Sequence, residues 1–403
     1  MSSERPVGIA IDSEVGLPGA LIVRAQGETV ATLRPGQGLP FADSTIDAIH
    51  CGPLADGFSG PAQLKLLLEC RRSLVPRGTL AVDGARCYQL SAASAALAGF
   101  EARHGCFVKP DRCIRGEPLV SIAIPAYNAR FFGACLESAL AQTYRNIEVV
   151  VCDDSPGQGI ETLVRERAHG AAVRYERNVA RLGPRGNFIR CLERSEGEFV
   201  KLLCDDDALA PQCVARQVDA FRQAPDIALA TSRRRRIDAA GRALPDQPAT
   251  VPIVGGDNLI EGRTLANAMV MAGLNSVGEP STVLFRRADL APPGYFGFAG
   301  AEGHGIIDMA TWTALLLKGD AVYLRDALSS FRIHAGQRQH DPAKARRNIQ
   351  SIRELQAAWL GFALHEGLEP DRLRVKPFPP HGAAWREAPL LGFAARAIER
   401  PEL

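Results

Sequence analysis

The feature that most constrains this chain is a regular alternation of strand and helix patterns between residues 119 and 230. An apolar run at 119–124 is followed by apolar residues at helical spacing and by a second apolar run at 147–151. Strand, helix and strand within about 35 residues form a βαβ unit, which requires a parallel sheet. The alternation then continues with strand patterns at 173–175, 199–203 and 227–230 and helix patterns at 186–193 and 211–223. Ligands of such sheets bind beyond the carboxyl ends of the strands.

Two further regions flank this segment, so we expect three domains: residues 1–116, 117–338 and 339–403. A linker rich in charged residues and turn formers precedes Pro118, and Pro342 occupies the first position of a C-terminal helix pattern with an apolar stripe. The predicted fold class is α/β. It consists of a Rossmann-like domain, a small α/β N-terminal module and a helical C-terminal extension.

Charge and composition exclude several classes of protein. The chain has 47 Lys+Arg against 45 Asp+Glu, and a formal charge of +2 argues against a nucleic-acid partner. No apolar stretch reaches the ~18–20 residues that span a bilayer, and the first residues do not resemble a secretory signal. The cysteines form no Cys-x-x-Cys pair, as expected for reduced, buried thiols. We therefore expect a cytoplasmic protein, at most peripheral at a membrane.

Polar residues gather where strands of the central region end. Pro125–Asn128 ends the first strand, Asp153–Ser155 the second, and Asp205–Asp207 the strand pattern at 199–203. Adjacent carboxylates repel one another unless a cation is present, and oxygen ligands suit Mg²⁺ or Mn²⁺. The pattern predicts a divalent metal that would also neutralise a diphosphate. The alternative is that these aspartates are loop residues or caps of the next helix.

These three motifs, in this order and spacing, resemble those of the family 2 glycosyltransferases, and the likeness covers about residues 118–337. The resemblance implies a GT-A fold, a single α/β domain that binds a nucleotide sugar. It also implies a nucleotide-sugar site and a metal site. The nucleotide-sugar residues would be Pro125, Tyr127, Asn128, Asp153, Asp154, Asn187, Asp205 and Arg332. The metal ligands would be Asp206, Asp207 and His334.

The aspartate run departs from the family's Asp-x-Asp motif. Cys204 stands where the first aspartate is usual, so which pair of carboxylates binds the metal stays open. Asp206 matches the family's second aspartate. For His334, which closes an Arg-x-His element, the alternative is a structural histidine after a strand.

Asp308 lies in the stretch where the family places its general base. An inverting transfer needs one carboxylate to take the proton of the attacking hydroxyl, and we assign that role to Asp308. The alternative is an acidic residue that stabilises the N-terminus of a helix through the macrodipole.

The predicted function is an inverting, metal-dependent transfer of a sugar from a nucleoside diphosphate sugar, with a UDP-sugar as the favoured donor. The acceptor would be a hydroxyl of a glycan, a glycolipid or a protein-linked glycan. The rival hypothesis is a catalytically silent scaffold that binds nucleotides or glycans. The cysteine at position 204 favours the scaffold, whereas the spacing of Asp308 favours the enzyme.

The N-terminal region has a resemblance of its own. Residues 39–49 and 69–80 resemble the second half of a class I S-adenosylmethionine methyltransferase. That family binds its cofactor through a glycine-rich loop after the first strand, and no G-x-G turn opening a helix precedes Leu39. We therefore expect a degenerate, non-catalytic module.

A run of four arginines, Arg233–Arg236, has two interpretations. On a strand, alternation places two arginines on each face, so that one pair could reach a phosphate. A β-hairpin with its turn at residues 239–241 would account for the run without any function, and we favour the hairpin.

Overall fold

The computed structural model describes residues 8–13, 21–25, 28–33, 39–41, 45–51, 60–82, 92–103, 106–168, 172–290, 297–298, 306–335 and 342–391. The chain divides into two compact units. One comprises residues 1–112 and 359–367, and the other comprises residues 113–358 and 368–403. Within the described residues, no helix is both long enough and apolar enough to span a membrane.

The first unit is built on a seven-stranded sheet with the strand order β3-β2-β1-β4-β5-β7-β6. Its elements are β1 (Gly8–Ser13), β2 (Leu21–Ala25), β3 (Glu28–Leu33), β4 (Ile46–Cys51), α1 (Gly60–Ser73), β5 (Leu74–Val82), α2 (Ala92–Leu97), β6 (Glu101–Arg103) and β7 (Cys106–Val108). Strands β1, β4 and β5 run parallel, and α1 connects β4 to β5.

The other half of this sheet is antiparallel. Strand β1 pairs with β2, and β2 pairs with β3, both in antiparallel register. A phosphate-binding loop of the dinucleotide type needs a strand followed by a crossover helix and a parallel strand. In this sheet such a crossover joins β4 to β5 through α1, whereas β1, β2 and β3 pair in antiparallel register.

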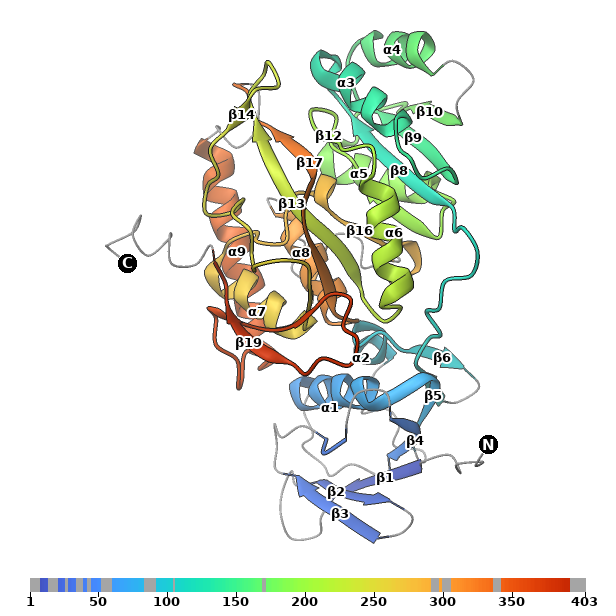
Figure 1. Cartoon of the computed structure of the whole chain (residues 1–403), viewed down its shortest axis with the longest axis vertical. Coiled ribbons are helices and arrows are strands. Elements are labelled where there is room, and N and C mark those ends of the chain that lie inside the picture. The colour runs from blue at the N-terminus through green and yellow to red at the C-terminus, as the bar shows by residue number, and fades with distance from the viewer. Residues whose placement is uncertain are drawn as a thin grey trace, which may run out of the picture. The chain divides into compact units, whose positions relative to one another are not determined.

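The second unit carries a sheet of twelve strands with helices packed against it (Figure 1). Its first elements are β8 (Val120–Ala126), α3 (Ala129–Leu140), β9 (Ile147–Asp153), α4 (Gly159–Arg167), β10 (Val173–Arg177), α5 (Gly183–Arg194), β11 (Phe199–Leu202), β12 (Ala208–Leu209), α6 (Cys213–Gln223), β13 (Leu229–Ile237) and β14 (Ala243–Leu244). They are followed by β15 (Asn258–Ile260), α7 (Gly262–Ala272), the 3₁₀ turn η2 (Pro280–Thr282), β16 (Leu284–Arg286), the 3₁₀ turn η3 (Arg287–Asp289), α8 (Ile307–Leu316), β17 (Ala321–Arg332), α9 (Pro342–Gly361), β18 (Arg372–Pro377) and β19 (Arg386–Pro389).

The parallel half of this sheet is the part that the sequence predicts. Strand β8 pairs in parallel with β9 on one side and with β11 on the other, and β10 extends the sheet beyond β9. Residues 120–124 of β8 are all buried, as a central strand covered on both faces requires. The carboxyl ends of these strands consequently lie at one edge, which brings the polar motifs together.

Beyond β11 the sheet becomes mixed. Strand β16 is antiparallel to both β11 and β13, whereas β17 runs parallel to β13. The alternation of strands and helices predicts a purely parallel sheet, and this prediction is correct for only one half of the domain. Strand β16 follows the η2 turn rather than a crossover helix, so it enters the sheet in the opposite direction.

The C-terminal region is not wholly helical, which corrects one expectation. Helix α9 covers 342–361, but β18 and β19 follow it as an antiparallel pair. Strand β18 pairs with β15 and so joins the large sheet. Leu373 and Val375 of β18 are fully buried on alternate positions, a strand period that the charged residues between them obscured in the sequence.

The arginine run lies on β13, and the hairpin interpretation is confirmed. Strand β13 pairs with β14 in antiparallel register, and the N–H of Gly241 donates to the carbonyl of Asp238 in the turn. Arg233 forms an ion pair with Asp246, whereas Arg234 is buried.

Helix α7 begins in tight contact with the turn that precedes β17. The Gly262 N–H donates to Asp320 Oδ1 at 3.0 Å, and a Cβ at Gly262 would lie 2.2 Å from the carbonyl oxygens of Leu316 and Gly319. Because these atoms belong to the backbone, they cannot rotate away. The first position of α7 therefore requires glycine.

We predict that Gly262→Ala lowers the free energy of unfolding by about 1–3 kcal/mol, as overpacking of a dense interior does. Urea unfolding followed by circular dichroism measures the change. Gly157→Ala is the matched control, since a Cβ there meets no atom within 4 Å. Equal unfolding midpoints for the two variants would contradict the prediction.

Candidate active site

The turn after β8 is held by Asp205. One carboxylate oxygen of Asp205, Oδ2, accepts hydrogen bonds from the N–H groups of Tyr127 (2.6 Å) and Asn128 (2.7 Å). Asn128 in turn caps α3 by accepting from the Arg130 N–H. Burial raises the pKa of Asp205 to about 6, and the two N–H groups act in the opposite direction. Tyr127 remains exposed at this turn, with the guanidinium of Arg181 over its ring at 4.9 Å.

Asp153 and Asp154 end β9, and both are buried. Asp153 accepts from the Ser155 N–H and from the Tyr175 hydroxyl, each at 2.8 Å. Asp154 accepts from three groups of the segment that leads into α5: the Asn178 amide, the Leu182 N–H and the Gly183 N–H. These carboxylates therefore shape the loop that follows β10.

Asn187 on α5 links the same three segments. Its Nδ2 donates to the carbonyls of Ala126 and Cys152, and its Oδ1 accepts from the Asn178 amide. Pro125 lies opposite Cys152 in the β8–β9 register. The structure thus brings the residues predicted to bind the nucleotide to one edge, and Asn187 serves there as a buried connection between strand ends.

Asp206 faces the end of β17, far along the chain. Its Oδ2 lies 3.1 Å from His334 Nε2, although 128 residues separate them. The His334 ring packs on Phe131 with a centroid distance of 4.8 Å. The guanidinium of Arg332 stacks on the same ring at 4.8 Å, and its Nε donates to the Asp206 carbonyl. One carboxylate, one imidazole and one guanidinium thus meet around Phe131.

Asp207 turns inward. Its Oδ1 accepts from the Arg332 N–H at 3.0 Å, and its Oδ2 accepts from the Ser281 hydroxyl at 2.6 Å. The same hydroxyl accepts from the Cys204 N–H, so Ser281 ties the aspartate run to η2. Burial, followed by the neighbouring charge of Asp206, raises the pKa of Asp207 well above its ordinary value. Both carboxylate oxygens of Asp207 thus accept hydrogen bonds within the fold.

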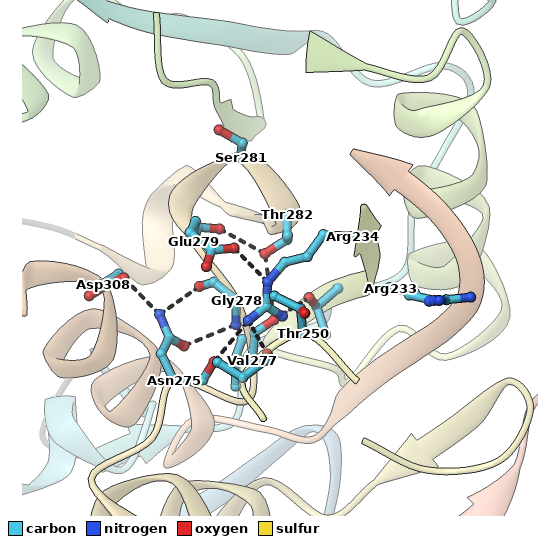
Figure 2. A network of polar contacts seen from close by, with 12 residues as sticks. Arg233, Arg234, Thr250, Asn275, Val277, Gly278, Glu279, Ser281, Thr282 and Asp308 are labelled. Atoms are coloured by element: carbon cyan, nitrogen blue, oxygen red, sulfur yellow. Dashed lines mark hydrogen bonds and ion pairs between the residues drawn. The ribbon is translucent and has the colours of Figure 1, made fainter. Parts of the chain in front are cut away.

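Asp308 is the second residue of α8 and is half-buried. Its Oδ1 accepts from the Met309 N–H at 2.8 Å, and its Oδ2 accepts from the Asn275 amide at 2.7 Å. Figure 2 shows Asn275, from the turn before η2, and Asp308, from α8, pointing toward each other. Burial raises the pKa of Asp308 to about 6, and the charge of Glu279 acts in the same direction.

Asp206 and His334 bring a carboxylate oxygen and an imidazole nitrogen together, a pair of groups of the kind that binds divalent cations. Within the described residues, no group of three or more His, Cys, Asp or Glu side chains is arranged to hold a metal. Mg²⁺ and Mn²⁺ sites of nucleotide-dependent enzymes commonly use one or two protein ligands and complete the shell with water and phosphate oxygens. A carboxylate 3.1 Å from an imidazole fits such a site.

Residues 121–290 match the family model described as "Glycosyl transferase family 2". The match begins in β8 and ends after β16, so it contains all three polar strand ends. Residues 121–290 form a family 2 glycosyltransferase domain. Together with the α/β topology, the match identifies a GT-A domain.

Two relatives of this glycosyltransferase domain have stated activities. Chondroitin synthase of Escherichia coli is 34% identical over 131 residues, which cover 32% of this chain and 19% of that protein. A UDP-Glc:alpha-D-GlcNAc-diphosphoundecaprenol beta-1,3-glucosyltransferase of Escherichia coli is 32% identical over 101 residues, covering 25% of this chain and 40% of that protein. The chain thus matches well under half of each.

Two solved structures align with part of the chain. TarS of S. aureus (residues 1-349), in complex with UDP-GlcNAc, aligns with a TM-score of 0.43 and 17% identity, covering 61% of this chain and 73% of that chain. The mannosyltransferase PcManGT from Pyrobaculum calidifontis, in complex with GDP-Man and Mn2+, aligns with a TM-score of 0.40 and 19% identity, covering 72% of this chain and 84% of that chain.

Sequence reasoning missed three residues that the structure places in this region. Phe131 lies in the helix pattern between the first two apolar runs, but its ring contacts Arg332 and His334. Asn275 and Ser281 lie in a turn with no strand or helix period, and each bonds one of the aspartates. The signal available was the Gly-Glu-Pro turn at 278–280, which indicates a tight bend but does not reveal its partners.

We predict that Asp205→Ala lowers the free energy of unfolding by about 1–3 kcal/mol, because two backbone N–H groups lose a charged acceptor. Asp205→Asn retains an oxygen at the same place and should lose less than half as much. Urea unfolding of the two variants beside the wild type measures the difference. Equal losses would show that the hydrogen bonds to Tyr127 and Asn128 do not stabilise the turn.

Proposed function

We propose that this glycosyltransferase domain transfers a sugar from a nucleoside diphosphate sugar to a hydroxyl group, with inversion at the anomeric carbon. A UDP-sugar is the favoured donor, and a glycan, a glycolipid or a protein-linked glycan is the favoured acceptor. The observation that carries the proposal is the pairing of Asp206 with His334 beside Arg332, because it gathers a carboxylate, an imidazole and a guanidinium beyond the strand ends.

The donor would bind at the carboxyl edge of β8, β9 and β11. Tyr127 is 40% exposed there and offers an aromatic face to a base or sugar. Asp153 and Asp154 would act mainly by holding the surrounding loop, because their oxygens already accept hydrogen bonds from the chain. Pro125, Asn128, Asn187 and Asp205 would preserve the shape of the turn.

A divalent cation, Mn²⁺ or Mg²⁺, would be held by Asp206 and His334, and when bound it would supply positive charge for the diphosphate. Asp207 would position this pair rather than bind the cation, since both of its carboxylate oxygens already accept hydrogen bonds from the chain. Arg332 keeps its guanidinium over Phe131 and adjacent to Asp206, where it would add a fixed positive charge.

Asp308 would act as the general base. The acceptor hydroxyl would give its proton to the carboxylate while its oxygen bonds to the anomeric carbon. The bond from that carbon to the diphosphate oxygen would break, and the nucleoside diphosphate would leave with the electron pair. A carboxyl group with a pKa of about 6 is ionised at neutral pH and is a stronger base than an ordinary aspartate.

We predict that Asp308→Asn lowers kcat by about 10²–10⁴-fold, the usual contribution of a general base, with donor binding unchanged. Only the ionised acid can accept a proton, so kcat/KM of the wild type should fall as the pH drops through about 6. Initial rates with a panel of sugar nucleotides and acceptors between pH 5 and 9 test both statements.

Asp219→Asn is the control for Asp308→Asn, because Asp219 is exposed on α6. It should keep both kcat and the acidic limb of the pH profile. Turnover that survives Asp308→Asn would remove Asp308 from the mechanism. Nucleotide binding with no turnover of any sugar nucleotide would favour a silent scaffold.

We predict that one nucleoside diphosphate raises the unfolding temperature of the wild type more in the presence of Mn²⁺ than in its absence. A ligand at a hundred times its Kd stabilises a folded protein by about 2.7 kcal/mol. Asp206→Asn and His334→Ala should lose the additional shift caused by Mn²⁺. His381→Ala, at an exposed histidine, should retain it. An equal Mn²⁺ effect in all variants would exclude Asp206 and His334 as metal ligands.

A further inference from the structure

The turn between α7 and η2 is closed by the side chain of Asn275. Its Oδ1 accepts from the Gly278 N–H at 2.9 Å, and its Nδ2 donates to the Gly278 carbonyl at 2.9 Å. The same Nδ2 donates to Asp308 Oδ2 at 2.7 Å. One amide therefore closes the turn and holds the carboxylate at once, as Figure 2 shows.

The turn itself is clamped by two buried side chains. Arg234, 3% exposed on β13, forms an ion pair with Glu279 at 2.5 Å and donates to the Asn275 carbonyl at 3.1 Å. From α8, Trp312 Nε1 donates to the Gly278 carbonyl at 2.8 Å. Asn275 is thus fixed relative to both the sheet and the helix that carries Asp308.

Only glycine at position 278 allows the turn to adopt this conformation. Its φ is +121°, and a Cβ there would lie 2.3 Å from Thr282 Oγ1. Because the turn cannot relax at Gly278, the direction of the Asn275 side chain is determined by the fold.

The two oxygens of Asp308 are held from different elements. Oδ1 is bound by the N–H of Met309 within α8, and Oδ2 by Asn275 from the turn. These two hydrogen bonds prevent the carboxylate from rotating about its last side-chain bond. They also oppose the burial and the negative charge of Glu279, both of which disfavour ionisation. Glu279 is in turn paired with Arg234.

We propose that Asn275 is a positioning residue for the general base, whose amide holds the Asp308 carboxylate ionised and in one orientation. This inference rests on the proposed role of Asp308. The Arg234–Glu279 pair and Trp312 would keep Asn275 in place. The orientation of the Asp308 carboxylate would therefore depend on the turn as well as on α8.

Two substitutions test the proposal in the full-length protein. Asn275→Asp has the same shape and still accepts from the Gly278 N–H, but it replaces the donor to Asp308 with a second carboxylate. Asn275→Ala removes the amide altogether. Both should lower kcat by roughly tenfold to a hundredfold, as misplacement of a catalytic group does, with the KM for the donor unchanged.

Both variants should also move the acidic limb of the kcat/KM profile to higher pH, and Asn275→Asp more than Asn275→Ala, because the added carboxylate repels the charge of Asp308. Carbon-13 NMR of the carboxyl groups, with Asp308→Asn to assign the signal, follows the same titration without any turnover. A titration midpoint for Asp308 equal to that of the wild type in both variants would overturn the proposal.

Asn258→Ala is the matched control. Asn258 is 2% exposed and its Nδ2 donates to the carbonyls of Gly255 and Gly256, so it also closes a glycine turn, but its described hydrogen bonds involve no acid. It should leave kcat and the Asp308 titration unchanged. A comparable loss of kcat in Asn258→Ala, with no shift in titration for the Asn275 variants, would assign Asn275 a merely structural role.

The outcomes separate this inference from the proposed function. Turnover that survives Asp308→Asn contradicts the assignment of the base, and the inference fails with it. Loss of turnover in Asp308→Asn, together with wild-type kcat and pH profile in both Asn275 variants, contradicts the inference alone.

Discussion

Carboxylate oxygens at the strand ends accept hydrogen bonds from the chain itself, and the shape of the site depends on these bonds. Asp205 holds the turn after β8, and Asp154 holds the loop that leads into α5. A buried carboxylate is costly unless it is hydrogen-bonded, so each loop must bring its N–H groups to the acid. Asp206 differs from its neighbours, because its carboxylate faces the His334 imidazole. Aspartates thus order the loops of the site, and an aspartate is also proposed to bind the cation.

A continuous set of polar contacts links this edge of the sheet to Asp308. Ser281 bonds Asp207 from η2, and the turn just before η2 contains Asn275, which bonds Asp308. Buried Arg234 stabilises that turn through Glu279. The same guanidinium also donates to the Asn275 carbonyl, so Arg234 contacts the turn at two residues. The proposed cation-binding pair and the proposed base are therefore supported by one connected scaffold rather than by separate loops.

The N-terminal unit combines a parallel strand–helix–strand segment with antiparallel strand pairs. The β4–α1–β5 segment forms a parallel unit, in line with the methyltransferase-like residues that it contains. Beside it, β1 pairs with β2 and β2 pairs with β3, both in antiparallel register.

The sequence by itself determined the parallel half of the large sheet and the positions of the acidic motifs, because apolar periodicity and the residues that end a strand are local properties of the chain. It could not reveal β18 and β19, whose charged segments form strands by pairing with β15 and with each other, respectively. Only the tertiary structure decided how the acids differ. The partners of Asp206 and Asp207 lie 128 and 74 residues away, and no local pattern specifies a hydrogen bond over such a distance.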